Sequence, residues 1–159
     1  ELDYLWIEEP LQEFDMIGLK RLSDAIDLPV LALESVEGLP YLATPYLQNN
    51  VVDIVRNQAM GITGQMKLAN LAEMFGKNTH GGHAQVLAAI RNDDWYEHHA
   101  REAFQRGDNM PRRPLSLAAS ELIKETSEVR DGYMYVPQTP GLGREIDWEQ
   151  IEARTIMEI

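Results

Sequence analysis

Short apolar segments alternate with longer segments of helical periodicity along the first hundred residues. Apolar runs at 5–8, 29–33 and 51–55 predict three strands. Apolar residues at helical spacing predict a helix over 13–26, and residues 64–76 carry the clearest helical stripe of the chain. The repeated strand–helix order is typical of an α/β fold with parallel strands and right-handed crossovers.

The remaining elements have weaker patterns, and the regular alternation ends near residue 105, where Met-Pro-Arg-Arg-Pro interrupts it. We therefore expect two parts, an α/β part over 1–105 and a tail over 106–159 that packs against its rim. The weaker predicted elements are an interrupted helix over 36–48, strands at 77–80, 95–97 and 132–137, and helices over 84–90, 116–127 and 148–153.

Composition excludes several classes of function. The formal net charge of −12 argues against a general surface for nucleic acids or anionic membranes, both of which need clustered Lys and Arg. The absence of cysteine rules out disulfides and thiolate zinc sites, and it fits a reducing cytoplasm, where we expect the protein to reside. No apolar run approaches the roughly 18 residues that span a bilayer.

Polar residues that suit acid–base chemistry fall at or near successive predicted strands. They are Glu8, Glu34, Asp53, His80 and Glu97. Each alone has an ordinary explanation, such as a solvated strand end or a surface histidine. The carboxyl ends of barrel strands face one mouth, however, so agreement across five elements favours a common site. Two carboxylates there are suited to share a hard divalent cation.

Ordered short motifs give the chain a resemblance to a known family. They are Trp-Ile-Glu-Glu-Pro (6–10), Leu-Ala-Leu-Glu-Ser (31–35), Val-Asp-Ile-Val-Arg (52–56), Gly-Ile-Thr-Gly (61–64), Leu-Ala-Glu-Met-Phe-Gly (71–76) and Pro-Gly-Leu-Gly (140–143). Together they resemble the enolase superfamily, in particular the mandelate racemase and acid-sugar dehydratase subgroup. The resemblance implies a modified TIM barrel of the (β/α)7β type. Residues 1–105 would form about strands four to eight of the barrel, and 106–159 would return to the capping domain.

The resemblance also implies roles for the strand-end residues. Glu8 and Glu34 match two of the three acids that bind Mg²⁺ in the family. Asp53 and His80 match the pair in which histidine moves a proton and aspartate orients it. Glu97 matches the acid that hydrogen-bonds the substrate carboxylate.

Three further residues are candidates for substrate contact, namely Arg56, Asn57 and His83. For Arg56 a salt bridge to Asp53 is the competing structural role. His83 is also the alternative to His80 as the base, because both flank the pair Gly81-Gly82.

The implied activity is magnesium-dependent removal of the proton α to a carboxylate of a sugar acid, followed by dehydration through an enediolate. This sequence has no counterpart of the family's second-strand lysine base, which favours dehydration over racemisation or epimerisation of a 2-hydroxy acid. Two other hypotheses stay open. One is a non-catalytic half-barrel that needs its missing half, and the other is an unrelated α/β domain with solvated acids. Open strand edges lead us to expect a homo-oligomer.

Overall fold

The structure is a computed structural model, and it describes residues 2–35, 41–58, 61–97, 122–124, 128–141, 143 and 145–157. The chain forms two compact units, residues 1–97 and 98–159, and each is described here by itself. The domain boundary expected near residue 105 lies outside the described residues.

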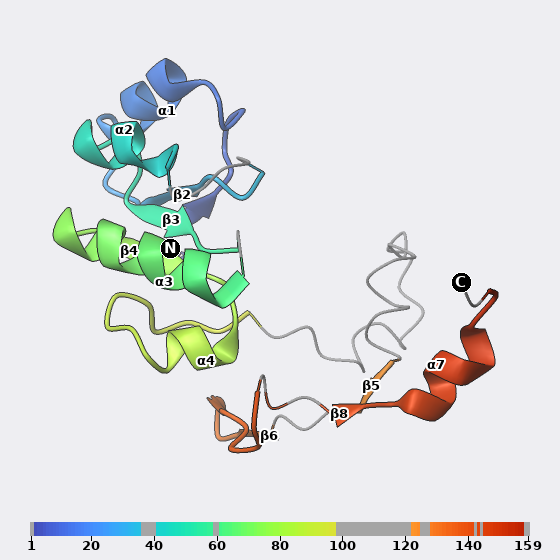
Figure 1. Cartoon of the computed structure of the whole chain (residues 1–159). Helices are drawn as coiled ribbons and strands as arrows, with labels where there is room; N and C mark the ends of the chain where they lie inside the picture. The colour runs from blue at the N-terminus through green and yellow to red at the C-terminus, as the bar shows by residue number, and fades with distance from the viewer. Residues whose placement is uncertain are drawn as a thin grey trace. The chain divides into compact units, whose positions relative to one another are not determined.

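Four short parallel strands form the sheet of the first unit (Figure 1). In spatial order they are β1 (Ile7–Glu8), β2 (Val30–Ala32), β3 (Ile54–Arg56) and β4 (Asn78–His80). Spatial order equals chain order, as in a barrel built from successive β/α units. The α/β class and the parallel pairing predicted from the sequence are therefore confirmed.

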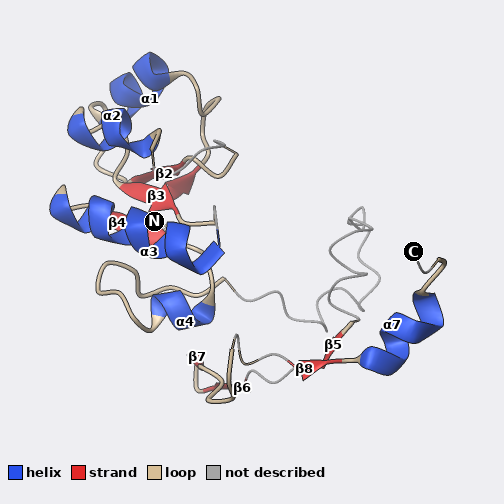
Figure 2. Ribbon diagram, in the orientation of Figure 1, coloured by secondary structure: helices blue, strands red, loops and turns tan. Residues whose placement is uncertain are grey.

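Three helices connect successive strands (Figure 2) and bury one face of the sheet, and a fourth follows β4. They are α1 (Met16–Ser23), α2 (Ala43–Gln48), α3 (Gly61–Met74) and α4 (Ala84–Leu87). Leu19, Leu47 and Leu68 from the first three helices share one core with Val30 and Val55 of the sheet. Burial of these side chains removes apolar surface from water and fixes the strands in register.

The opposite face of the sheet carries the polar residues. Side chains alternate between the two faces of a strand, and residues paired across parallel strands point to the same face. Leu31 pairs with Glu8 on one side and with Ile54 on the other, and Arg56 pairs with His80. We call the face that carries these five residues the inner face. Its polar members all lie at the carboxyl ends of their strands.

Two predicted elements are wrong. Residues 95–97 form no strand, because the Trp95 N–H donates to Asp93 Oδ1 at 3.1 Å in a local turn instead of joining a ladder. Within the helix predicted over 116–127, Ile123–Lys124 is strand β5, paired antiparallel with β8 (Glu145–Ile146). The rest of that predicted helix, apart from Leu122 in a turn, lies outside the described residues.

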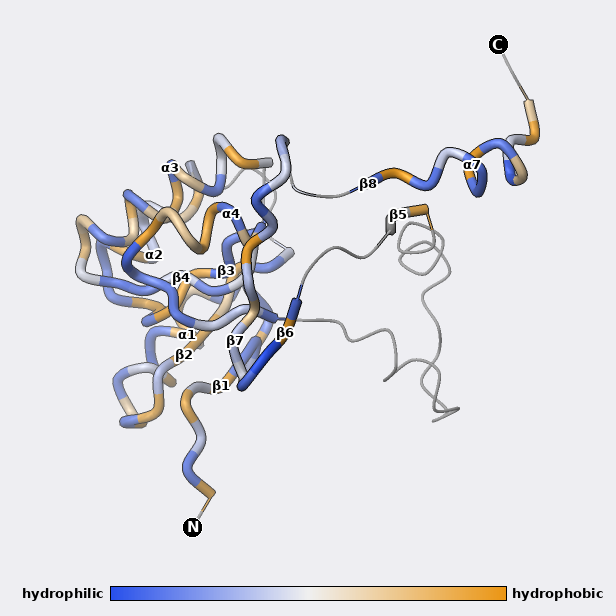
Figure 3. Tube along the Cα trace, turned by 90° about the horizontal axis from the view of Figure 1, so that it is seen from below, coloured by the Kyte–Doolittle hydropathy of each residue, from blue (hydrophilic) through white to orange (hydrophobic). Residues whose placement is uncertain are grey.

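The described part of the second unit contains two small antiparallel pairs and one helix. β6 (Glu128–Arg130) pairs with β7 (Tyr133–Tyr135), and helix α7 spans Trp148–Arg154. The side chain of Asp147 caps α7 by accepting from the Gln150 N–H at 3.1 Å. β6 is exposed and largely hydrophilic (Figure 3). Among the described residues, no helix has the length and apolar character needed to cross a bilayer.

Candidate active site

A buried arginine organises the carboxyl edge of the inner face. Arg56 ends β3, and its side chain is only 3% exposed. Its Nη1 donates to Glu8 Oε1 at 2.9 Å, and its Nη2 donates to Glu97 Oε2. Glu34 Oε1 lies 4.0 Å from the same Nη2. Glu8, Glu34 and Glu97, predicted from three separate elements, therefore meet at one guanidinium.

Gln58 completes the set of partners of Arg56. With its amide oxygen turned toward Arg56, Gln58 accepts from Nε at 3.0 Å and from Nη2 at 2.8 Å. The amide nitrogen then donates to Glu34 Oε1 at 3.0 Å. A buried guanidinium is stable only when its charge and its donors are matched, and here each of the three nitrogens has a partner.

The Gly81-Gly82 turn after β4 packs against this arrangement. Both residues have positive φ, +89° and +93°. A Cβ on Gly81 would lie 3.4 Å from Arg56 Nε, and one on Gly82 would lie 2.6 Å from the Asn57 carbonyl oxygen. The left-handed backbone favours glycine at both positions, and at Gly82 the Asn57 carbonyl oxygen also occupies the space that a Cβ would need.

Three carboxyl groups lie close together beside the arginine. Burial, the charges of Glu34 and Glu13, and hydrogen bonds with both carboxyls raise the pKa of Glu9 from 4.5 to about 7. Glu13 is buried and accepts from the Ser35 N–H at 2.8 Å. Between about pH 4.5 and 7, Glu9 therefore keeps a proton that an ordinary glutamate loses.

His80 ends β4 and lies between an aromatic ring and a carboxylate. It is 6% exposed. Its ring is centred 4.9 Å from that of Trp6, and its Nδ1 lies 3.8 Å from Asp93 Oδ1. His80 also lines a cavity of about 390 Å³. Pro29, Asp53 and Lys77, which precede β2, β3 and β4, line it as well, so this cavity extends toward the amino ends of the strands and away from Arg56.

The predicted pair of Asp53 and His80 does not form. Asp53 precedes β3, and its carboxylate accepts from Lys77 Nζ at 3.0 Å and from the Val30 N–H at 3.1 Å. His80 is in register with Arg56, three residues further along. Three residues of strand cover about 10 Å, so Asp53 lies at the opposite end of the sheet. The alternative salt bridge between Arg56 and Asp53 is wrong for the same reason.

The other two predicted contact residues lie beside the Gly81-Gly82 turn. Asn57 is fully buried, and its backbone N–H donates to the His80 carbonyl at 2.7 Å. Its burial does not support contact with a substrate. His83 is the N-cap residue of α4, and its backbone N–H donates to Gln65 Oε1 at 3.0 Å. These bonds fix the chain on either side of the Gly81-Gly82 turn.

Sequence reasoning missed Glu9, Glu13, Gln58 and Asp93. Gln58 lies two residues after Arg56 and so extends the alternation of β3 beyond the strand, which is a signal that could have identified it. Asp93 lies in a loop, and no periodicity indicates its place beside His80. Glu9 and Glu13 lie on the segment between β1 and α1, where the sequence shows only adjacent acids.

Two carboxylates at this edge of the sheet face the same cation, the guanidinium of Arg56. Glu8 and Glu34 direct carboxylate oxygens toward one positively charged group, and both side chains keep about a third or more of their surface exposed. In the described ranges, no group of three or more His, Cys, Asp or Glu side chains is arranged to hold a metal ion. The site therefore offers two carboxylate ligands, and a guanidinium contacts both.

Known proteins share the sequence of this chain over most of its length. Residues 1–151 match the model of a protein family described as enolase C-terminal domain-like. Arabinonate dehydratase of Saccharolobus solfataricus is 28% identical over a match that covers 90% of this chain and 38% of the dehydratase. Muconate cycloisomerase 1-2 of Acinetobacter lwoffii is 26% identical over a match that covers 92% of this chain and 38% of that enzyme.

A solved structure agrees with the sequence matches. The crystal structure of D-glucarate dehydratase from Agrobacterium tumefaciens, complexed with magnesium, superposes with a TM-score of 0.73 and 32% sequence identity. The match covers 94% of this chain and 39% of that chain. The present chain thus spans about two fifths of the length of these proteins.

Proposed function

The chain belongs to the enolase superfamily, through its match to the enolase C-terminal domain-like family, and from that premise we propose that the protein containing it dehydrates a sugar acid. The observation that carries the proposal is the convergence of Glu8 and Glu34 on one cationic position at the edge where His80 ends β4. Related enzymes named as dehydratases of sugar acids support this choice of reaction.

Magnesium is the cofactor that we propose for this reaction. The donor set fits, because Mg²⁺ is commonly bound through one or two carboxylates and otherwise keeps water and substrate oxygens. Glu8 and Glu34 would hold it, and the guanidinium of Arg56 marks their shared preference for positive charge. When bound, a divalent cation stabilises negative charge that develops on a substrate carboxylate.

We assign His80 the role of the base. Its Nδ1 faces Asp93, so Nε2 is the atom that accepts the α-proton of the substrate. The buried carboxylate of Asp93 lies beside Nδ1, and the ring of Trp6 restricts the orientation of the imidazole. Asp93 therefore takes the positioning role that the resemblance assigned to Asp53.

Dehydration of the substrate begins with the removal of this α-proton. The electron pair of the α C–H bond forms an enediolate and then breaks the bond from the β-carbon to its hydroxyl. The hydroxyl takes the proton held by His80 and leaves as water, and the remaining enol tautomerises to a 2-keto-3-deoxy acid. Isomerisation is the second candidate, since a muconate cycloisomerase is among the relatives. The two outcomes differ in product but share the removal of the α-proton.

Full-length protein incubated with a panel of pentonic, hexonic and hexaric acids and Mg²⁺ tests the proposal. We expect a 2-keto-3-deoxy acid from at least one member, detected as its semicarbazone. In ²H₂O, exchange of the α-proton reports on proton removal even where no water is lost. Exchange or inversion without dehydration would select the isomerase, and the absence of both across the panel would contradict the proposed function.

A further inference from the structure

Arg56 occupies the position that a metal ion would need. Its Nη1 lies 2.9 Å from Glu8 Oε1 and its Nη2 lies 4.0 Å from Glu34 Oε1, the carboxylates proposed above as metal ligands. A guanidinium and a divalent cation repel each other, and both require negative oxygen ligands. The two cations cannot share these oxygens at full strength.

The guanidinium is firmly held in this place. Glu97 contacts its Nη2, and Gln58 accepts from both Nε and Nη2. Gly81 lies beside it, at a distance where a Cβ would be in ordinary van der Waals contact with Nε, 3.4 Å away. Glu97 and Gln58 thus anchor Arg56 through partners additional to the proposed metal ligands.

We propose that Arg56 is an internal cation that competes with Mg²⁺ for Glu8 and Glu34, so that metal binding requires release of the guanidinium from these two carboxylates. The inference rests on the metal proposed for the function above, and it does not depend on which reaction the protein catalyses. By linkage, a change that favours release of the guanidinium and leaves Glu8 and Glu34 intact strengthens Mg²⁺ binding.

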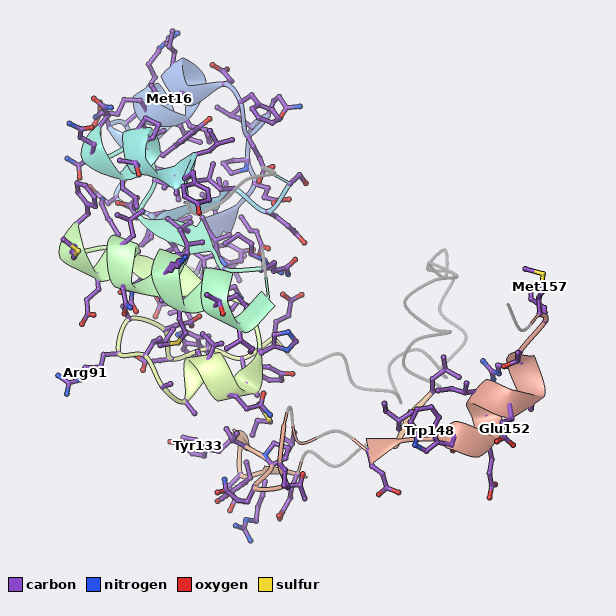
Figure 4. The ribbon with its side chains drawn as sticks, viewed as in Figure 1. Met16, Arg91, Tyr133, Trp148, Glu152 and Met157 are labelled. Carbon is purple, nitrogen blue, oxygen red and sulfur yellow. The ribbon has the colours of Figure 1, made fainter. Side chains whose placement is uncertain are left out.

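The first test compares Mg²⁺ affinities of full-length wild-type protein and the Arg56→Gln variant by isothermal titration. Loss of the competing charge is expected to tighten binding by about tenfold or more. Arg91→Gln serves as the matched control, because Arg91 is exposed and extends away from the ribbon (Figure 4). We expect the control to bind like the wild type. Equal or weaker binding by Arg56→Gln, or no binding by any of the three proteins, would overturn the proposal.

A second test needs no variant and therefore covers the case in which Arg56→Gln fails to fold. The Nε–H of Arg56, held by Gln58, is followed by ¹H–¹⁵N NMR while Mg²⁺ is added to the wild-type protein until saturation. Release of the guanidinium is expected to move or broaden this signal in proportion to metal uptake. A signal that stays unchanged at the highest metal concentration would overturn the proposal. Failure of the proposed function alone would leave both binding results intact.

Discussion

The Glu9 side chain shows how the crowding of acids changes the chemistry of one group. Glu9 directly follows β1, and its backbone adopts a positive φ of 47°. Its side chain lies beside Glu13 and Glu34. Burial and two neighbouring carboxylates raise its pKa from 4.5 to about 7. Ionised carboxylates that lie close together repel one another, so a proton on Glu9 lowers the energy of the folded cluster.

This raised pKa predicts a pH dependence of stability. Below about pH 4.5 Glu9 is protonated in both the folded and the unfolded chain, and between 4.5 and 7 mainly the folded chain holds the proton. The free energy of unfolding should therefore fall as pH rises through this window. Because the residue is exposed, we expect a fall of about 1 kcal/mol. Urea unfolding in metal-free buffer at several pH values measures it.

Glu9→Gln supplies the control for that measurement. The amide cannot ionise, so this part of the pH dependence should disappear and the variant should be the more stable protein at neutral pH. An identical pH profile in wild type and variant would show that Glu9 titrates normally.

His80 and Asp93 give a prediction about activity. His80→Asn should slow α-proton exchange by about 10²-fold or more, the usual contribution of a general base. Asp93→Asn leaves the imidazole in place, so kcat should fall by at least about tenfold with little change in KM. The rate of α-proton exchange in ²H₂O, measured over a range of substrate concentrations, tests both variants, with Tyr133→Phe as an unrelated control. An unchanged kcat in Asp93→Asn would mean that this carboxylate is only structural.

At the residue scale, the sequence predicted that Glu8 and Glu34 lie close together, and both approach Arg56 in the structure, whereas their role as metal ligands stays a prediction. Glu8 and Glu34 follow apolar runs, and a parallel sheet brings such strand ends together. The same argument failed for Asp53, since alternation defines which face a side chain takes and not which end of the strand it occupies. The contact between Arg56 and three glutamates depends on side-chain reach across the sheet, which no local pattern encodes.

At the scale of elements, the Gly81-Gly82 turn links β4 to the position of Arg56. Gly82→Ala would bring a Cβ to within 2.6 Å of the Asn57 carbonyl oxygen at a φ of +93°. Gly76→Ala has a similar φ of +67° but no neighbouring atom within 4 Å, so it isolates the cost of the backbone conformation. We expect Gly82→Ala to lower the free energy of unfolding by about 2 kcal/mol more than Gly76→Ala, measured by urea unfolding.

Equal losses in the two glycine variants would contradict the packing described for the turn. A larger loss in Gly82→Ala together with tighter Mg²⁺ binding would extend the account, because displacement of the turn also loosens Arg56.

Elements with strong apolar periodicity were the most predictable. Helix α3 and strand β2 lie close to their expected positions. Their apolar side chains belong to the hydrophobic core, so the periodicity of the sequence matches the burial of the side chains. Residues 95–97 have an apolar start but no strand partner, and the side chain of Asp93 captures the Trp95 N–H. Local capping of this kind competes with a ladder and is hard to predict from a short apolar run.

At the scale of the whole molecule, the sheet of β1 to β4 has two open edges among the described residues. There β1 pairs only with β2 and β4 pairs only with β3, while Leu2, Tyr4 and Leu5 beside β1 are more than half exposed. Unpaired edges beside apolar side chains favour association. We predict that the 159-residue chain self-associates, as measured by sedimentation over a dilution series. A monomer at every concentration would contradict this, and Leu5→Lys should weaken the association.

The family assignment indicates the class of barrel, which local hydrophobic patterns alone do not predict. Ordered motifs predicted a barrel, and the match over residues 1–151 places the chain in the family. The second unit was less predictable, because β5 and β8 pair residues more than twenty positions apart and the pairing involves only two residues of each strand. Long-range pairing of such short strands leaves almost no periodic signal.

The central claim is that Glu8 and Glu34 together form one binding position for a divalent cation. Calorimetric titration of full-length protein with Mg²⁺ tests it most directly, with Glu8→Gln, Glu34→Gln and, as the exposed control, Glu73→Gln. We predict a single site in the wild type and in the control, and its loss in both of the other variants. Binding that is absent from the wild type, or unchanged when either glutamate is replaced, would contradict the claim.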